Sequence, residues 1–380
     1  MSIVDLCERG LIPDALTRLG MRKLMQRRLL DEGRDNGEAR SRRYNEFLAE
    51  LRAGPIAVET KAANQQHYEV PAEFFHLHLG PRLKYSCCLY PSGNETLARA
   101  EELMLELYAA RAGLKDGMRI LDLGCGWGSL SLWLAEKFPA SKIVGLSNSH
   151  GQREFILRRA ADRGLHNLTV VTGNIVDFQF PPSFDAQFDR VISIEMFEHM
   201  KNYGLLLHKV SRWMKPDAKL FVHIFVHRLL AYHFEAKESP HPTTGSTGGS
   251  PLSRDAGEGR KSAAEGRRVT QGDWMSRYFF TGGTMPSENL LLNFQDDLKL
   301  ETQWWVSGTH YEKTANHWLA GMDARKSEIM PVFRQGYGGP GATLWFNRWR
   351  MFYMAVAELF GYAGGEEWGV GHYLFVSRRS

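Results

Sequence analysis

Cysteine is scarce in this sequence, which contains Cys7, Cys87, Cys88 and Cys125 among its 380 residues. No two of them form a CxxC pair, and two are adjacent, so their spacing excludes a disulfide framework. The pattern provides no metal-binding motif either. It is typical of a reducing compartment, and we expect cytoplasmic localisation.

Long apolar segments are also missing. No window approaches the roughly 18 apolar residues that a membrane-spanning helix needs. The first residues, MSIVDLCERGLIPD, lack the basic stretch and the apolar core of a secretory signal peptide. The sequence therefore predicts an intracellular protein without a transmembrane segment.

Neither sign of charge dominates. The chain has 47 Lys and Arg against 43 Asp and Glu, a net charge of +4, and its one short basic run covers 22–28. A nucleic acid is therefore not an expected partner. The basic run could lie on an anionic membrane, but its spacing is only weakly amphipathic, which favours a solvated helix in an N-terminal cap.

Strand and helix patterns alternate between residues 118 and 227. Such alternation, with apolar strands, predicts an α/β fold built on a parallel, doubly wound sheet. The predicted strands are 118–123, 142–147, 168–173, 190–194 and 219–226, and the predicted helices between them are 129–138, 151–164 and 202–215. Further helices are predicted upstream at 14–30, 38–54 and 95–113, and an irregular aromatic stretch at 64–93.

Residues 237–272 differ sharply from this pattern. The segment is rich in Gly, Ser, Pro and charged residues and nearly free of large apolar side chains. We interpret it as a disordered surface insertion that activity does not need.

Tryptophan is concentrated near the C-terminus. Seven of the ten tryptophans follow residue 272. They could form an aromatic core, or line a pocket for a flat or cationic organic group, and the two interpretations are compatible. These residues are Trp274, Trp304, Trp305, Trp318, Trp345, Trp349 and Trp368.

Three glycines, Gly124, Gly126 and Gly128, lie between the first predicted strand and the next helix, in ILDLGCGWGSLSL. Glycine there permits a tight turn and lets a ligand approach the N–H groups of a helix start. A dinucleotide site would carry GxGxxG and an acidic residue after the second strand, where this chain has GLSNSHGQ. A phosphate-binding loop would carry Gly-Lys-Ser/Thr. S-adenosylmethionine, which needs amides for its carboxylate and an apolar slot for adenine, fits better.

The segment RVISIEMFEHM runs from an apolar strand into two carboxylates and a histidine. Glu195, Glu198 and His199 stand at i, i+3 and i+4, so a helical turn would place all three on one face. Such a trio is either a proton-handling site or a solvated helix start. At the carboxyl end of a strand beside the glycine loop, where open α/β sheets bind ligands, the first interpretation is favoured.

Six segments together resemble the coclaurine N-methyltransferase branch of the cyclopropane fatty acid synthase (mycolic acid cyclopropane synthase) superfamily. They are LDLGCGWGSLSL, YSCCLY, RVISIEMFEHMKNY, AYHFE, YFFTGGTMPS and AELFGYAGGEEW, which extend over nearly the whole chain. The resemblance implies a class I methyltransferase that uses S-adenosylmethionine. It also implies a Rossmann-like sheet of seven strands, an N-terminal helical cap and an aromatic C-terminal lid.

The resemblance further implies which residues hold the cofactor. This chain has Asn174 where the alkaloid enzymes tend to carry Asp, a conservative departure at an adenine contact. The implied contacts are Tyr85, Ser86, Gly124 and Gly126 for the amino-acid end, Ser147, Asn148 and Gln152 for the ribose, and Asn174 and Ile175 for the adenine.

Two reactions are open to such a site. In the N-methyltransferases the trio handles the amine, so Glu195 and Glu198 would bind the nitrogen of a cyclic amine such as a tetrahydroisoquinoline, and His199 would be the base. In the cyclopropane branch a bound bicarbonate is the base in methylene or methyl transfer to an unsaturated acyl lipid. The implied bicarbonate ligands are all present, as Cys87, Glu198, His223 and Tyr311.

These expectations divide the chain into four parts. The acceptor, amine or lipid alkene, is the expected partner, and the sequence leaves a homodimer open. The parts are a helical cap and cofactor-covering segment at 1–90, the methyltransferase core at 91–236, the insertion at 237–272, and a substrate-covering region with the last strands of the sheet at 273–380.

Overall fold

The computed structural model describes residues 2–58, 71–182, 187–234 and 271–378. The predicted insertion lies outside these residues, except that 271–272 begin helix α10 (Gln271–Tyr278). No helix in the described ranges is long and apolar enough to cross a membrane.

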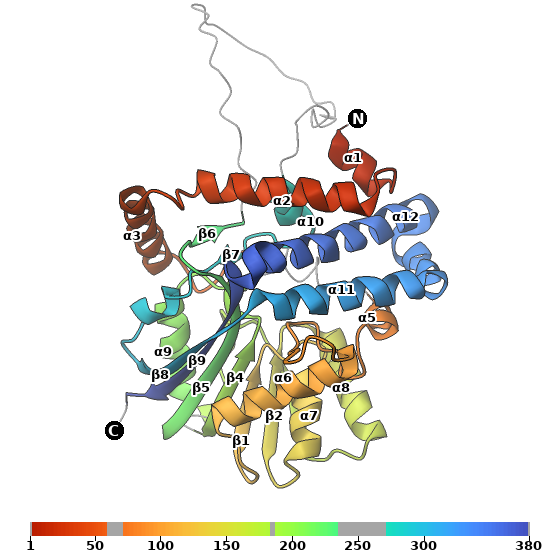
Figure 1. The fold of residues 1–380 in the computed structure, drawn as a ribbon. Helices are drawn as coiled ribbons and strands as arrows, with labels where there is room; N and C mark the ends of the chain where they lie inside the picture. The colour runs from red at the N-terminus through yellow and green to blue at the C-terminus, as the bar shows by residue number, and fades with distance from the viewer. Residues whose placement is uncertain (1, 59–70, 183–186, 235–270, 379–380) are drawn as a thin grey trace, which may run out of the picture.

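The centre of the molecule is a seven-stranded sheet in the order β3-β2-β1-β4-β5-β9-β8 (Figure 1). The first five strands in the chain are parallel, and β8 and β9 are antiparallel to their neighbours. This confirms the predicted α/β sheet. The strands are β1 (Arg119–Leu123), β2 (Lys142–Ser147), β3 (Leu168–Thr172), β4 (Phe188–Ile194), β5 (Met214–His227), β8 (Leu298–Val306) and β9 (Trp368–Ser377).

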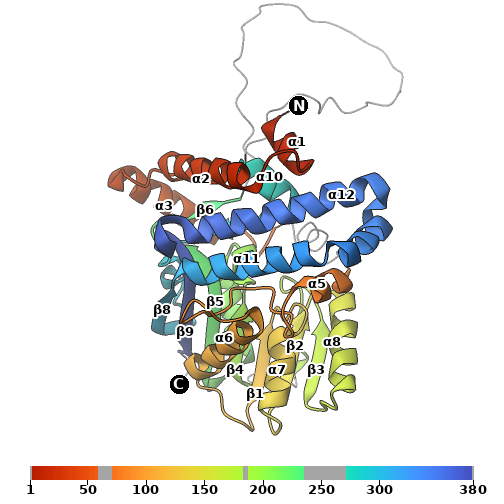
Figure 2. The ribbon, with the colours of Figure 1, turned by 45° about the vertical axis from the view of Figure 1, so that its right-hand side comes forward.

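Both faces of the sheet are buried, as the continuous apolar strands predict. Along β1, Ile120 joins a core with Tyr108 and Trp133, whereas Leu121 belongs to a second core with Trp213. Helices on one face supply the first core and a helix on the other supplies the second (Figures 1 and 2). They are α6 (Leu97–Ala112), α7 (Ser129–Lys137) and α8 (His150–Asp162) on one face and α9 (Tyr203–Trp213) on the other.

The N-terminal helices are α1 (Ile3–Glu8), α2 (Asp14–Asp31) and α3 (Gly37–Ala53), and the last two agree with the helices predicted at 14–30 and 38–54. The prediction of an irregular stretch before the core was wrong in one part, because α5 (Ala72–His78) is helical. Pro71 precedes its first turn, and Phe74 and His78, one turn apart, are both buried. The dense aromatics of this segment hide that spacing.

Two long helices lie across the molecule between α2 and the sheet (Figures 1 and 2). They are α11 (Gly308–Ala324) and α12 (Lys326–Gly361), which is kinked at Gly338, where φ is 72°. A second, two-stranded sheet is formed by β6 (Tyr232–His233) and β7 (Thr284–Met285). Short 3-10 turns in the described part of the chain are η2 (Phe197–His199), η3 (Leu290–Asn293) and η4 (Tyr362–Gly365).

The contact of α11 with β9 predicts a large effect for one methyl group. A Cβ atom added at Gly308 would lie 2.1 Å from the Trp368 carbonyl oxygen and 2.2 Å from that of Phe360. Backbone cannot move aside as a side chain can, so we expect Gly308→Ala to lower the free energy of unfolding by about 3 kcal/mol. Denaturant titration followed by circular dichroism measures it.

Gly20→Ala, in α2, is the matched control. A Cβ atom there meets nothing within 4 Å, so better helix propensity should raise the free energy of unfolding by up to about 1 kcal/mol. Equal effects of the two substitutions would contradict the predicted close contact.

Candidate active site

The glycine loop follows β1, and the trio follows β4, the strand beside it. Gly126 and Gly128 have φ values of 51° and 80°, in the left-handed region. A Cβ atom at Gly128 would lie 2.6 Å from Ile156 of α8, so glycine is needed there for packing. A Cβ atom at Gly126 would meet nothing within 4 Å. The backbone at Gly126 therefore faces open space, as a ligand site needs.

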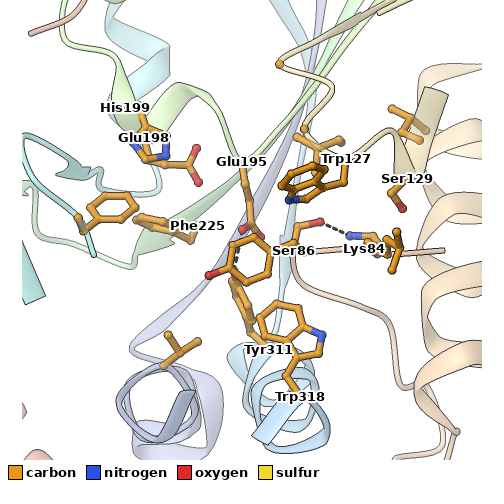
Figure 3. Close-up of a pocket in the computed structure, with 18 of the residues that line it drawn as sticks. Lys84, Ser86, Trp127, Ser129, Glu195, Glu198, His199, Phe225, Tyr311 and Trp318 are labelled. Atoms are coloured by element: carbon orange, nitrogen blue, oxygen red, sulfur yellow. Dashed lines mark hydrogen bonds between the residues drawn. The ribbon is translucent and has the colours of Figure 1, made fainter. Parts of the chain in front are cut away.

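Two cavities adjoin at this edge of the sheet. Both are lined by Gly124, Gly126, Gln152, Glu195 and His199. The first lies between the glycine loop, η2 and the two long helices (Figure 3). The second lies beside the ends of β2 and β3. An elongated ligand can therefore occupy both and pass the glycine loop.

All nine residues expected to hold S-adenosylmethionine line these cavities. Two buried polar atoms next to the loop, Ser129 Oγ and Gln152 Nε2, have no hydrogen-bond partner among the described residues, so a ligand could bond to them. The set therefore fits a cofactor with a polar amino-acid end and a nucleoside. Tyr85 and Ser86 line the first cavity, Ser147, Asn148, Asn174 and Ile175 line the second, and Gly124, Gly126 and Gln152 line both.

The trio does not share a helical face, so that prediction was wrong. Glu195 has φ 47° directly after β4, and only Phe197–His199 form a 3-10 turn. The left-handed backbone conformation of Glu195 directs its side chain away from those of Glu198 and His199. In Figure 3, Glu195 points toward Tyr311, whereas Glu198 and His199 lie together on another wall of the cavity.

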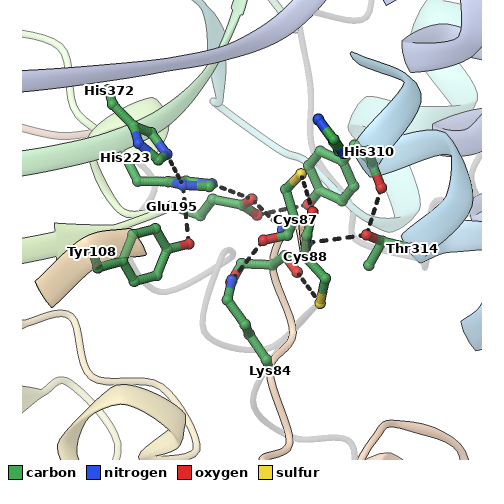
Figure 4. A network of polar contacts seen from close by, with 11 residues as sticks. Lys84, Cys87, Cys88, Tyr108, Glu195, His223, His310, Thr314 and His372 are labelled. Carbon is green, nitrogen blue, oxygen red and sulfur yellow. Dashed lines mark hydrogen bonds and ion pairs between the residues drawn. The ribbon is translucent and has the colours of Figure 1, made fainter. Parts of the chain in front are cut away.

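Three donors converge on the Glu195 carboxylate (Figure 4). Oε1 accepts a hydrogen bond from the Cys87 backbone N–H at 2.9 Å and lies 3.1 Å from His223 Nε2. Oε2 accepts a hydrogen bond of 2.6 Å from the Tyr311 hydroxyl. Three of the four expected bicarbonate ligands are thus brought together, but around a carboxylate of the protein itself. Cys87 contributes its backbone rather than its thiol, whose Sγ lies 3.3 Å from the Cys88 carbonyl oxygen.

Glu198 has a different environment. Its side chain is buried, and Oε2 has no hydrogen-bond partner among the described residues. Burial, and then the like charge of Glu195, raise the pKa of Glu198 well above its usual range. A carboxylate with a raised pKa and an unsatisfied oxygen in a cavity is suited to accept a proton from a ligand.

Much of the lining of the first cavity is aromatic. Trp318 lines the first cavity, whereas Trp349 packs in the core against Phe74 and Phe279. The C-terminal tryptophans are therefore divided between the core and the lining of the cavity. The aromatic lining includes Phe225, Phe234, Phe280, Tyr311, Trp318, Phe352 and Phe360.

Sequence reasoning missed several residues of the site, most notably Lys84. This lysine is 1% exposed, and its Nζ donates to Ser86 Oγ at 2.5 Å and to the Cys87 carbonyl oxygen at 2.7 Å. It therefore holds the segment that presents the Cys87 N–H to Glu195. Its position directly before YSCC was the available signal. Trp127 and Ser129, within and after the glycine loop, were missed as well.

Known proteins are similar to this chain over nearly its whole length. The family model for mycolic acid cyclopropane synthetase matches residues 57–360. (S)-Coclaurine N-methyltransferase of Thalictrum flavum subsp. glaucum is 36% identical over 375 residues, which cover 98% of this chain and 94% of that protein. Pavine N-methyltransferase of the same plant is 31% identical over 380 residues, covering 99% and 97%.

A solved structure is similar over the same extent. Coclaurine N-methyltransferase bound to N-methylheliamine and SAH superposes with a TM-score of 0.85 and 34% identity, and the match covers 99% of each chain.

Proposed function

Because the chain belongs to the mycolic acid cyclopropane synthetase family of S-adenosylmethionine-dependent methyltransferases, we propose that its methyl acceptor is the nitrogen of a cyclic amine, such as a tetrahydroisoquinoline. The unsatisfied Glu198 carboxylate in an aromatic cavity carries the proposal. The relatives named for coclaurine and pavine support it, as does the N-methylheliamine in the similar structure.

The cofactor, held by the residues that line the two cavities, supplies an electrophilic methyl group. The protein must then position the amine and keep it neutral, because a protonated amine has no lone pair with which to attack. Each pKa unit of the amine above ambient pH adds about 1.4 kcal/mol to the barrier. We assign Glu198 to bind the ammonium group and, with His199, to accept its proton.

The aromatic lining suits the same acceptor. A ring system packs against aromatic side chains, and their π faces attract a cation. Tyr311 stacks on Phe360 with ring centroids 4.5 Å apart, and His199 lies against Phe280 at 4.8 Å. Aromatic groups thus surround the position at which the trio would meet the amine.

Methylene transfer to an unsaturated acyl lipid, with bicarbonate as base, is the alternative. It would need Cys87, His223 and Tyr311 to bind a free anion. Their donors are engaged by Glu195, so the alternative requires Glu195 to leave them. This observation favours amine methylation without bicarbonate.

S-adenosylmethionine with a fully deuterated methyl group separates the two reactions. The purified protein is offered a panel of cyclic amines and, separately, unsaturated phospholipid vesicles, and mass spectrometry counts deuterium in each product. We expect an amine product that retains three deuterium atoms, because N-methylation breaks no C–H bond. Added bicarbonate should not change its rate.

A lipid product with two deuterium atoms would overturn the proposal, since ring closure transfers one of the three deuterons of the methyl group to the base. Cofactor binding without turnover on any amine of the panel would also count against it.

A further inference from the structure

A second layer of polar residues lies behind Glu195, away from the cavity. His223 Nδ1 lies 2.8 Å from His372 Nε2, and His372 Nδ1 lies 2.5 Å from Arg111 Nη1. The two histidines are paired directly across β5 and β9, and Arg111 reaches them from α6. Both histidine side chains are completely buried. The contacts form one line from Arg111 to the Glu195 carboxylate (Figure 4 shows its two histidines).

Arginine fixes the direction of every hydrogen bond in this line. A guanidinium group can only donate, so His372 Nδ1 is an acceptor. A neutral His372 then carries its hydrogen on Nε2 and donates it to His223 Nδ1. His223 in turn carries its hydrogen on Nε2, which points at Glu195 Oε1.

The charge state of the histidines agrees with this direction. Burial, followed by the nearby cations, lowers the pKa of His223 well below its usual range. Burial and its neighbours His223 and Arg111 do the same to His372. Both are therefore neutral at physiological pH, and each carries one hydrogen.

We propose that Arg111, His372 and His223 are positioning residues, which form a one-way hydrogen-bond chain that keeps the Glu195 carboxylate ionised and oriented toward the substrate cavity. The effect of this hydrogen-bond chain on catalysis rests on the proposed amine methylation, whereas the direction of its hydrogen bonds does not. The hydrogen-bond chain gives the Glu195 carboxylate a third donor, in addition to the Cys87 N–H and the Tyr311 hydroxyl.

The hydrogen-bond chain cannot carry a proton away from Glu195. Every hydrogen in it points toward Glu195, so His223 Nε2 has no lone pair with which to accept a proton from that side. Passage in the other direction would require Arg111 to release a proton, which a guanidinium does not do in proteins. A proton taken from the amine must therefore leave on the cavity side, where Glu198 and His199 lie.

The charges that face Glu195 make its ionisation depend on such donors. Burial raises its pKa, and the charge of Lys84, the Tyr311 hydroxyl and the Cys87 N–H lower it. Glu198 and His199 face the same cavity from η2, and the buried Tyr108 hydroxyl on α6 lies 3.0 Å from His223 Nδ1. Loss of one donor should therefore move the protonation equilibrium of Glu195.

The substitution Arg111→Glu should reverse the direction of the hydrogen bonds from residue 111 to His223, and so tests the proposal. A carboxylate at 111 would accept from His372 Nδ1–H, so both histidines would change tautomer and leave a lone pair of His223 facing Glu195. Glu195 would then need a proton. A neutral Glu195 no longer raises the pKa of the base Glu198, so we expect the acid limb of kcat/KM for the amine to move down by about one pH unit or more. Arg111→Lys, which still donates, should restore the wild-type profile.

Arg99→Glu is the matched control, because it makes the same charge change on the exposed side of α6. An equal shift in this variant would reduce the effect to net charge and overturn the proposal. An unchanged profile in folded Arg111→Glu protein would overturn it too.

Nitrogen-15 NMR of histidine-labelled protein tests the chain independently of turnover. Single His223→Gln and His372→Gln variants assign the two signals. We expect neutral Nε2–H tautomers for both in the wild type and Nδ1–H tautomers in Arg111→Glu. Nδ1–H tautomers in the wild type would refute the chain even if amine methylation holds, and absent amine turnover with the expected tautomers would refute only the proposed function.

Discussion

Glu198→Gln is expected to lower kcat for a cyclic secondary amine by about 10²–10⁴-fold, with little change in the affinity for S-adenosylmethionine. Glutamine keeps the size and polarity of the side chain but cannot accept a proton. Glu198 lines the first cavity and not the nucleoside side of the site, so cofactor binding should survive. Initial rates and calorimetric titration measure the two quantities separately.

The pH dependence makes this prediction sharper. Burial and the charge of Glu195 raise the pKa of Glu198, and a base works only when unprotonated. Wild-type kcat/KM should therefore fall as the pH drops through that raised pKa, well above the usual range of a glutamate. The variant should lose this limb of the profile.

Glu328→Gln, on the exposed surface of α12, controls for the loss of one negative charge. It should keep both kcat and the acid limb. Near wild-type turnover in a folded Glu198→Gln protein would remove Glu198 from the proposed role and leave His199 as the candidate base.

The core of the fold could be predicted because its strands are short apolar runs between clear turn signals. β2 has the predicted bounds, and β1 and β3 differ from theirs by one residue at one end. Gly113 ends α6 in the left-handed conformation, as its place after the periodic pattern indicates. In these segments local propensity and burial favour the same structure.

The conformation of Glu195 could not be predicted, because local sequence disfavours it. A positive φ is uncommon for glutamate. Here the Glu195 N–H donates to the His223 carbonyl oxygen at 2.9 Å, and Cys87 and Tyr311 hold the side chain. These partners are distant in the chain, so the regular spacing of the trio pointed to a helical face that tertiary contacts override.

The same limit applies to the residues around Glu195. The family resemblance implied an anion site, and the structure places Cys87, His223 and Tyr311 together. The anion at this site is the Glu195 carboxylate itself, and it lies there because of the left-handed backbone turn at Glu195. Arg111 and His372 gave no signal, since an arginine in the last turn of a helix and a histidine in a strand are ordinary features.

Gly126→Ala is expected to raise the dissociation constant of S-adenosylmethionine by about tenfold to a hundredfold. The added methyl group would project into the open space beside the loop, where both cavities meet. A bound cofactor would then lose its close approach to the backbone. Isothermal titration measures the affinity, and thermal unfolding without cofactor measures the cost to the fold.

Gly164→Ala separates the two effects. Gly164 has φ 65° after α8, and a Cβ atom there also meets nothing within 4 Å. Both substitutions therefore carry a similar backbone penalty of about 1–2 kcal/mol. Only Gly126 adjoins the cavities, so only Gly126→Ala should weaken the cofactor. If both variants bind it equally, the space beside Gly126 is not where the cofactor lies, and the placement of its amino-acid end at this loop is wrong.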